Sequence, residues 1–498
     1  MSMPHPTAAL NPELEKTLAD LRSLVQQAAR DGTAAHEVER AVWDHILRIG
    51  RQALQLFFAL HGSGDQGATV CLPDGRPLDR LPEQHPRRYV SLFGAFDLRR
   101  TAYGSREGQK IEFVPLDNCL QLPASAFSYV LQDWDQALAA EQAFGQVNVT
   151  LARMLGLKQS VDSLEQMNRE MAGQATPFRL NRPAPPAAEE GEVFVVSADG
   201  KGVVLRRGPD DPAPPAYRSK GDKASHKRMA TVGTVYSLDR HVRTPEQVVA
   251  ALFRDGPRPE GKRPRPRHKQ VWASLPQPDV PASGMEAVFV WLLWEWGRRN
   301  PGGAKETVYL SDGQEALWEA REQYLGGHRT VGVLDLLHVT PRLWKAAHVF
   351  HPEKSPEAEA LVREWLVRVL RGQVAGVIHG LRVMGGRRAL TSAKRKALRE
   401  VCSYLEKNAA RMRYDEYLAA GYPIASGAIE GACRHLVKDR MERAGMHWTI
   451  PGAQAMLEVR SVYVSGQWEE YQAYRIALET QRLYPYREAA EPQYAMAV

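Results

Sequence analysis

Three acidic residues, each at the end of an apolar run or near the start of a helix, most strongly limit what this chain can fold into. Asp199 and Asp312 each follow a short strand-like run, and Glu430 opens a helical pattern much further along. Acids at two strand ends and on a later helix can meet at one point. Three such carboxylates can bind a pair of Mg²⁺ ions, which activate the attacking oxygen of a phosphodiester reaction and stabilise the leaving one. We therefore predict a site for phosphodiester chemistry.

Each acid also has a simpler interpretation. Asp199 precedes Gly200, a pair typical of hairpin turns, and Asp312 could cap the helix that follows it. Glu430 lies four residues before Arg434, so the two could form an exposed helical ion pair. These interpretations account for each acid alone. They do not account for the order of the strands or for the basic segment between the first two acids.

A further acid, Asp335, lies three residues before His338. The pair could face the same site, or it could be a structural hydrogen-bonded pair that supports a strand end. Around Glu430, helical spacing predicts a buried stripe, with Arg434 and Lys438 beside Glu430 on an adjacent face that could look toward DNA. The predicted stripe consists of Ile429, Cys433, Leu436 and Val437, so that Cys433 belongs to the core and is not a ligand.

The order of apolar patterns after residue 190 predicts the fold class, an α/β protein with an RNase H-like core. The order is β-β-β-α-β-α-β, with strands at 192–199, 202–207, 228–238, 307–312 and 329–335 and helices at 284–298 and 315–324. We expect the first part of this core over 191–340. An all-helical insertion over 341–422 follows, and 423–498 contains the last core helix and the C-terminal helices.

The preceding chain predicts a mainly helical DNA-binding region with a small β-hairpin. We expect two helices within 11–61, in a helical region 1–87 whose remaining residues, 62–87, form a loop. Residues 88–175 would hold a hairpin (88–100 with 110–114, turning at 103–105) and a helix-turn-helix. In that motif Gly156 lies in the turn and Ser160 caps the second helix. Two packed helices without a DNA role fit the motif equally well, and 176–190 resembles a linker.

Positive charge is concentrated between the first two acids. Residues 201–270 contain 17 Lys and Arg against 7 Asp and Glu, a surplus of ten, whereas the whole chain has a net charge of +7. Such a cluster suits a polyphosphate partner, although basic Pro-rich runs are commonly solvated loops. With the two cations after Glu430, the candidate DNA contacts are Arg218, Lys220, Lys223, Lys227, Arg228, Lys262, Arg263, Arg265, Arg267, Lys269, Arg434 and Lys438.

Cysteine usage and hydropathy indicate the cellular compartment of the protein. The four cysteines lie far apart with no CxxC pair, so a zinc site or a disulfide framework is not expected. The start of the chain lacks the order of a signal peptide, and the most apolar stretch, 287–296, is too short for a membrane span. We expect a reduced protein of the cytoplasm.

These residues resemble a family of bacterial insertion-sequence transposases, the ISKra-four family, a DDE-type group related to Mutator-like elements. The resemblance covers about residues 85 to 475. It rests on a segment from Tyr89 to Tyr103 and on Ala198-Asp-Gly-Lys-Gly-Val203, Tyr309-Leu-Ser-Asp-Gly313, Val333-Leu-Asp-Leu-Leu-His-Val339 and Ile424-Ala-Ser-Gly-Ala-Ile-Glu-Gly431.

The resemblance implies that Asp199, Asp312 and Glu430 are the metal-binding triad on an RNase H-like fold, with two Mg²⁺ ions that Mn²⁺ can replace. Asp335 and His338 match a motif thought to lie beside the active site, and Asp335 stays the runner-up for the second acid. We expect a transposase that binds its element's terminal repeats, hydrolyses the DNA ends and joins 3′ hydroxyls to target DNA as a dimer or larger assembly. The resemblance also implies a bacterial protein that is associated with the nucleoid when bound to DNA. A nuclease without strand transfer and a DNA-binding regulator are the alternatives.

Overall fold

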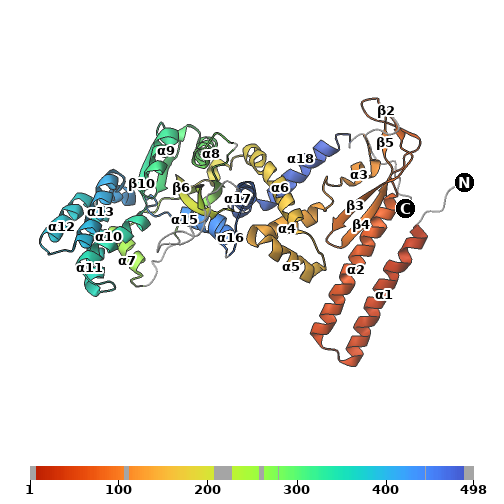
Figure 1. Ribbon diagram of the computed structural model, residues 1–498, viewed down its shortest axis with the longest axis horizontal. Coiled ribbons are helices and arrows are strands. Elements are labelled where there is room, and N and C mark those ends of the chain that lie inside the picture. The colour runs from red at the N-terminus through yellow and green to blue at the C-terminus, as the bar shows by residue number, and fades with distance from the viewer. Residues whose placement is uncertain are drawn as a thin grey trace, which may run out of the picture. The chain divides into compact units, whose positions relative to one another are not determined.

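The computed structural model describes residues 7–105, 111–206, 227–256, 263–278, 280–443 and 445–486 of a mixed α/β chain. The chain divides into two compact units. The first unit combines residues 1–170 with residues 469–498, and the second consists of residues 171–468. Figure 1 shows the elements of both units with the labels used here.

The first unit begins with two long helices, α1 (Thr7–Asp31) and α2 (Ala35–His61), which pack against each other. The prediction of two helices within 11–61 is therefore confirmed. The predicted loop over 62–87 is wrong, because this stretch contains β1 (Thr69–Cys71) and β2 (Pro77–Arg80). Strands form there because Leu72 and Leu78 are buried in a small apolar cluster, and Gly75, with a φ of 85°, turns the chain between them.

The hairpin of this unit lies earlier in the chain than expected. It consists of β3 (His85–Ser91) and β4 (Gly94–Arg100), in which Ser91 pairs with Gly94. The predicted turn at 103–105 is wrong, since Tyr103 and Gly104 form β5 and pair with β2. The chain turns before Gly94 instead, because this residue has a φ of 110°, which residues with a Cβ rarely adopt.

Helices complete the first unit and lead into the second. The elements are α3 (Pro115–Leu120), α4 (Tyr129–Glu141), α5 (Phe144–Leu155), α6 (Val161–Asn181) and α18 (Trp468–Leu483). The predicted helix pair is confirmed in shape: Gly156 is left-handed with a φ of 68°, and the Ser160 hydroxyl accepts from the amide of Ser163 at 3.0 Å. The predicted linker is wrong over 176–181, which remain helical because Phe178 is buried.

A mixed five-stranded sheet forms the centre of the second unit, in the order β10-β9-β6-β7-β8. Its strands are β6 (Val193–Val204), β7 (Lys227–Leu238), β8 (Arg267–Ser274), β9 (Glu306–Ser311) and β10 (Thr330–Leu334). β7 runs antiparallel to β6 and β8, whereas β9 is parallel to both β6 and β10. Residues 193–198 of the central strand β6 are all buried, as expected for a strand covered on both faces.

Two sequence-based strand assignments need correction. The strands expected at 192–199 and 202–207 are one strand, because Asp199 pairs with Val232 and Gly200 with Thr231, so the ladder to β7 continues where a turn was expected. The third strand is β8, from the segment expected to be a basic loop. Its charged start gives way to Val271 and Ala273, which are buried in the sheet.

Helices pack on the sheet and extend beyond its β10 edge. The helices up to β10 are α7 (Pro245–Phe253), α8 (Gly284–Arg299) and α9 (Glu315–Leu325). The helical block contains α10 (Leu336–Phe350), α11 (Pro356–Leu370), α12 (Val374–Gly386), α13 (Ser392–Asn408) and α14 (Tyr414–Ala419). Its all-helical character is confirmed, although its first helix starts at Leu336, directly after β10. Figure 1 shows α10 to α13 grouped beyond β10.

The chain then returns to the sheet with α15 (Gly427–Ala432), a π-helical turn (Cys433–Lys438), α16 (Asp439–Met441) and α17 (Ile450–Val464). α15 packs against β6 and β7, and α17 packs against β8. The predicted stripe of Ile429, Cys433, Leu436 and Val437 is buried, as expected. The helix that carries Glu430 is therefore held against the central strand.

The close approach of α8 to β7 gives a test of the packing. A Cβ added at Gly233 would lie 2.7 Å from Val288 Cγ1 and 3.1 Å from Trp291 Cζ3. We expect Gly233→Ala to lower the free energy of unfolding by about 1–3 kcal/mol, because the extra methyl must push α8 away. The same substitution at Gly297, in the exposed part of α8 with open space around it, should raise stability by up to about 1 kcal/mol. Denaturant midpoints of the two variants would show the contrast.

Candidate active site

The register of two parallel strands brings Asp199 and Asp312 side by side. Val196 on β6 pairs with Tyr309 on β9. Two residues further on, the hydroxyl of Ser311 donates to the carbonyl of Ala198 at 3.0 Å. The strands are therefore still adjacent at the residues just before the two acids. Asp199 continues along β6, whereas Asp312 follows the last residue of β9.

Asp335 extends this row to a third strand. It directly follows β10, and its backbone amide donates to the carbonyl of Ser311 at 2.9 Å. Asp335 therefore lies next to Asp312, on the side away from Asp199, as the strand order β10-β9-β6 requires. Three carboxyl groups from three neighbouring parallel strands share one edge of the sheet.

The side chain of Asp335 is fully buried and is occupied by hydrogen bonds. One oxygen accepts from the amides of Leu337 and Ser426, both at 3.0 Å. The other accepts from the hydroxyl of Ser426 and lies 2.7 Å from Nδ1 of His338. A carboxylate offers about four lone-pair positions, and all are used here. Asp335 thus caps α10 and holds the start of α15, which leaves it poorly placed to bind a metal.

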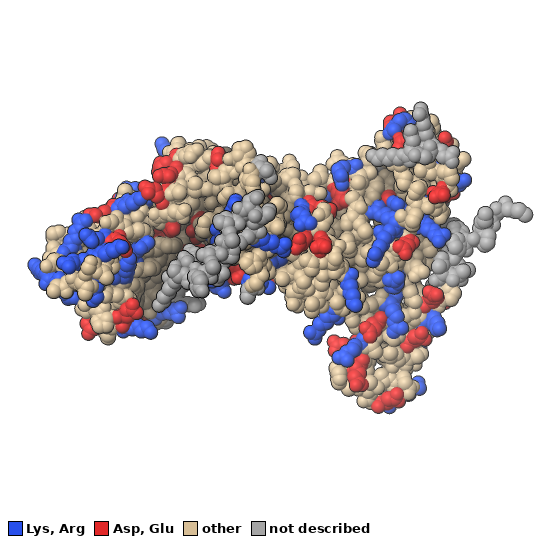
Figure 2. Space-filling view, viewed as in Figure 1, with Lys and Arg blue, Asp and Glu red and all other residues tan. Residues whose placement is uncertain are grey.

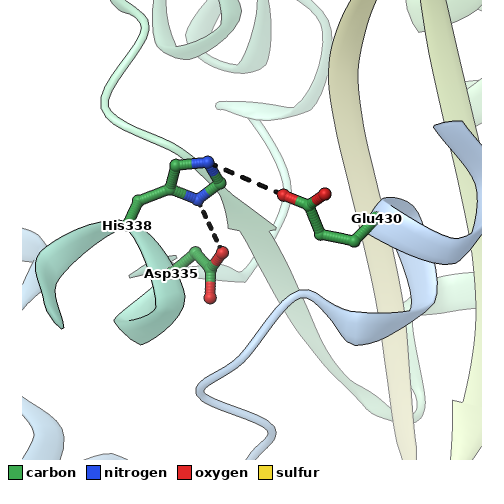
Figure 3. A group of neighbouring side chains, drawn as sticks. All are labelled: Asp335, His338 and Glu430. Atoms are coloured by element: carbon green, nitrogen blue, oxygen red, sulfur yellow. Dashed lines mark hydrogen bonds and ion pairs between the residues drawn. The ribbon is translucent and has the colours of Figure 1, made fainter. Parts of the chain in front are cut away.

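His338 connects this buried carboxylate to Glu430. Figure 3 shows the imidazole between the two carboxyl groups, with Nδ1 toward Asp335 and Nε2 toward Glu430. Nε2 lies 3.6 Å from the nearer oxygen of Glu430, and one ligand atom from each of the three residues lies within 4.8 Å of the others. The hydrogen bond to Asp335 raises the pKa of His338, and the charge of Glu430 adds to the effect. Asp335 therefore orients His338, and the other ring nitrogen of His338 approaches Glu430.

Glu430 lies on helix α15, near Asp199 and Asp335. Burial raises the pKa of Glu430, and the negative charge of Asp199 raises it further, while His338 and Lys201 act in the opposite direction. Its side chain keeps 45% of its surface exposed, so a ligand can reach it. The simple alternative of an ion pair with Arg434 has no support among the ion pairs of the described residues, in which Arg434 instead approaches Asp439 at 3.6 Å.

The ionised form of Asp312 is also disfavoured by its surroundings. Burial raises the pKa of Asp312, and the charges of Asp199 and Asp335 raise it further, although the amide of Gln314 donates to it at 2.8 Å. The charges of Asp199 and Asp335 thus oppose the ionisation of both Asp312 and Glu430, and solvent still reaches Asp199, Asp312 and Glu430. Such a set of oxygen donors fits a hard divalent cation such as Mg²⁺. Among the described residues, the group whose ligand atoms lie close enough together to hold an ion is Asp335, His338 and Glu430. The assignment of Asp199, Asp312 and Glu430 as metal ligands stays a prediction.

Two contacts at this site were not predicted from the sequence. Cys433 is buried as expected, but its thiol also donates to a carboxylate oxygen of Asp199 at 3.4 Å. Tyr404 on α13 lies so close to Gly313 that a Cβ there would be 2.6 Å from the ring. The glycine after Asp312 was a signal for a close approach, yet nothing in the sequence identified a partner 91 residues away.

The predicted basic contacts are only partly brought together. Arg218, Lys220, Lys223 and Lys262 lie outside the described residues. Lys227 is paired with Glu442 at 2.8 Å, and the side chain of Arg434 is 71% exposed. The remaining exposed or half-buried candidates are Arg228, Arg263, Arg265 and Lys438.

Arg267 and Lys269 belong to strand β8 and not to a basic loop. Arg267 is paired with Asp239. Lys269 donates to the carbonyl of Ala428 at 3.1 Å, and burial lowers its pKa. These two side chains therefore already have protein partners, and the Lys269 contact holds β8 to α15. A DNA role for the basic segment remains a prediction.

No protein-family model matches the chain, and a search of curated proteins found no match either. Among the described residues, no helix is long and apolar enough to cross a membrane.

The hydrogen bond between Ser426 and Asp335 gives a test of the buried network. Ser426→Ala removes one donor from a buried carboxylate oxygen, so we expect the free energy of unfolding to fall by about 1.5–3 kcal/mol. Ser392→Ala, at an exposed position at the start of α13, should change it by less than about 0.5 kcal/mol. Chemical denaturation measures both. An equal, small effect of the two substitutions would contradict the role given to Asp335.

The raised pKa of Asp312 gives a test with a defined sign. A carboxyl whose folded pKa lies above its ordinary value stabilises the fold only while protonated, and stability is lost as pH rises through the folded pKa. Without divalent ions, Asp312→Asn should therefore raise the Tm at pH 7 and have less effect at pH 4. Asp65→Asn is the matched control, because a hydrogen bond from the amide of Gly67 lowers the pKa of Asp65. It should lower the Tm at pH 7.

Proposed function

We propose that this protein is a DNA transposase that cuts the ends of its own element and joins them to target DNA. The observation that carries the proposal is the juxtaposition of Asp199 and Asp312 on neighbouring parallel strands, with Glu430 delivered from a helix to the same place. Carboxylates that repel each other at a solvent-accessible point are unfavourable for the fold alone. Carboxyl groups whose pKa values are perturbed in this way are typical of sites that bind a cation or act in catalysis.

The arrangement of the second unit supports an RNase H-like core. With β8 as the third strand, the order along the chain is three antiparallel strands followed by a helix, a parallel strand, a helix and a parallel strand. The short helix α7 between β7 and β8 is an addition to the expected order. The helical block comes between β10 and the helix that carries Glu430, where the resemblance to DDE-type transposases requires it.

In this proposal each side chain has a distinct task. Asp199, Asp312 and Glu430 hold two Mg²⁺ ions, for which Mn²⁺ can substitute, and when bound these supply activation of the attacking oxygen and stabilisation of the leaving one. Asp335 does not take the place of Asp312, because its oxygens are used by Ser426, His338 and Leu337. His338 keeps Glu430 in position, and Cys433 restrains Asp199.

The proposed reaction begins with water-driven cleavage of the element ends, and the freed 3′ hydroxyl then attacks target DNA. Both steps exchange one phosphodiester oxygen for another, so one metal-binding site serves both. Two element ends must be processed together, which requires two active sites. We therefore propose that the protein acts as a homodimer or a larger assembly on DNA.

The decisive experiment uses DNA that carries the flanks of the protein's own gene. The wild type should cut it at defined ends in Mg²⁺, while Asp199→Asn, Asp312→Asn and Glu430→Gln should abolish cleavage and leave end binding largely intact. Asp415→Asn, an exposed acid on α14, is the matched control and should cut like the wild type.

Each other outcome has a defined meaning. Cleavage without joined product in a plasmid assay would identify a nuclease that lacks strand transfer. Tight end binding with no cleavage in Mg²⁺ or Mn²⁺ would identify a DNA-binding regulator. Loss of binding in the Asp312→Asn protein equal to its loss of cleavage would refute the role given to this residue.

A further inference from the structure

A basic groove leads away from Asp312 along two helices of the helical block. One cavity of about 510 Å³ is lined by Asp312, Gly313, Arg342 and Lys345, among others. A second cavity of about 540 Å³ lies against α13. Arg342 and Tyr404 line both cavities, so the two lie next to each other. We call this the α10–α13 groove and define it by Arg342, Lys345, Lys396, Arg399, Tyr404 and Lys407.

Helical spacing places these cations on one face. Lys396, Arg399 and Lys407 are separated by three and eight residues along α13, which puts them on the same side of the helix. The opposite side of α13 is apolar and buried through Leu398, Val401, Cys402 and Leu405. α10 packs against α13 and contributes Arg342 and Lys345, three residues apart. In Figure 2 the Lys and Arg side chains gather over α12 and α13.

The groove keeps an excess of positive charge after its internal ion pairs are counted. The residues that line the two cavities include five Lys and Arg against two acids, Asp312 and Glu400. Lys345 is paired with Glu400 at 2.6 Å, and Lys407 with Glu315 at 2.6 Å. Among the ion pairs of the described residues, none includes Lys396 or Arg399, and both side chains are exposed. An anion is the ligand that this surface favours.

Tyr404 fixes the groove relative to the acids and also limits what can bind. The guanidinium of Arg342 lies 4.6 Å from the centre of the Tyr404 ring. Gly313 approaches the ring so closely that its Cβ would be 2.6 Å from Cε2. A ring that already contacts a guanidinium and the Asp312 loop is not a free platform on which a base can stack. The surface therefore suits the phosphates of a strand better than its bases.

We infer that the α10–α13 groove binds the phosphodiester backbone of the DNA strand that continues from the phosphate held at Asp312. This inference rests on the proposed function and specifies where its substrate lies. Lys396 and Lys407 are 11 positions apart and thus about 16 Å apart along the helix, which corresponds to about five nucleotides of duplex at 3.4 Å each. Because the groove contacts the phosphates of the DNA and not its bases, it increases the affinity for DNA of any sequence.

Salt dependence of DNA binding tests this inference directly. The probe is a fluorescent 30-base-pair duplex of mixed sequence, titrated with full-length protein in Ca²⁺ at several salt concentrations. Lys396→Ala with Arg399→Ala should lower the magnitude of the slope of log K against log salt by about 1.8, because two phosphate contacts are lost at about 0.9 each. The matched control (the α11 control) is Arg368→Ala with Arg371→Ala, one basic residue in the last turn of α11 and one directly after it, neither of which lines the groove. Its slope should equal that of the wild type.

The outcomes separate this inference from the proposed function. An unchanged slope in the groove variant, or an equal loss in the α11 control, would overturn the groove even if the wild type cuts DNA normally. Groove-dependent binding by a wild type that never cuts would refute the transposase and retain the groove. A duplex of RNA that binds in a groove-dependent manner while DNA does not would also overturn it. Thermal melts confirm that each variant is folded, and Lys396→Gln with Arg399→Gln repeats the test without shortening the side chains to Ala.

Discussion

The buried carboxylate of Asp335 is the interaction on which the rest of the site depends. It joins the end of β10, the first turn of α10 and the segment before α15, because its partners are Leu337, His338 and Ser426. A buried charge without partners would destabilise the fold by several kcal/mol or more. Here the charge is satisfied only when these segments are in place. Glu430 lies four residues after Ser426, so its position near Asp199 follows from that requirement.

The neighbouring acids show the opposite behaviour. Asp312 and Glu430 have raised pKa values because burial and the charges around them oppose ionisation. The structure thus contains one acid, Asp335, that stabilises the fold through its hydrogen bonds, and two, Asp312 and Glu430, whose ionised forms destabilise it. Solvent reaches these two acids, whereas Asp335 is buried. This division separates a structural carboxylate from candidate ligands more clearly than the spacing of the residues in the sequence.

The sequence predicted the acids of this site but not all of their surroundings. Runs of β-branched residues before Asp199 and Asp312 marked the strands, and Ser160 and Gly156 marked the helix pair, since these signals are local. The errors arose where a local signal was overridden by a distant partner. Asp199-Gly200 has the sequence of a turn, but both residues pair with β7. Strand β8 lies in a basic, Pro-rich segment whose composition is typical of a loop. The contacts of Tyr404 with Gly313 and of Cys433 with Asp199 depend on packing, which one sequence does not reveal.

The hydrogen bond from Ser426 to Asp335 spans 91 residues, and the helical block lies between its two ends. That block is also fastened to the sheet, through the hydroxyl of Tyr414 on the carbonyl of Leu334 and that of Tyr417 on the carbonyl of Gly332. Contacts so far apart in the chain form late, because the intervening segment must be ordered first. On the ribosome, Asp199 and Asp312 emerge well before Glu430, so an unfinished chain carries two acids without the third. The three acids therefore cannot come together before the ribosome has made the whole helical block and the helix after it.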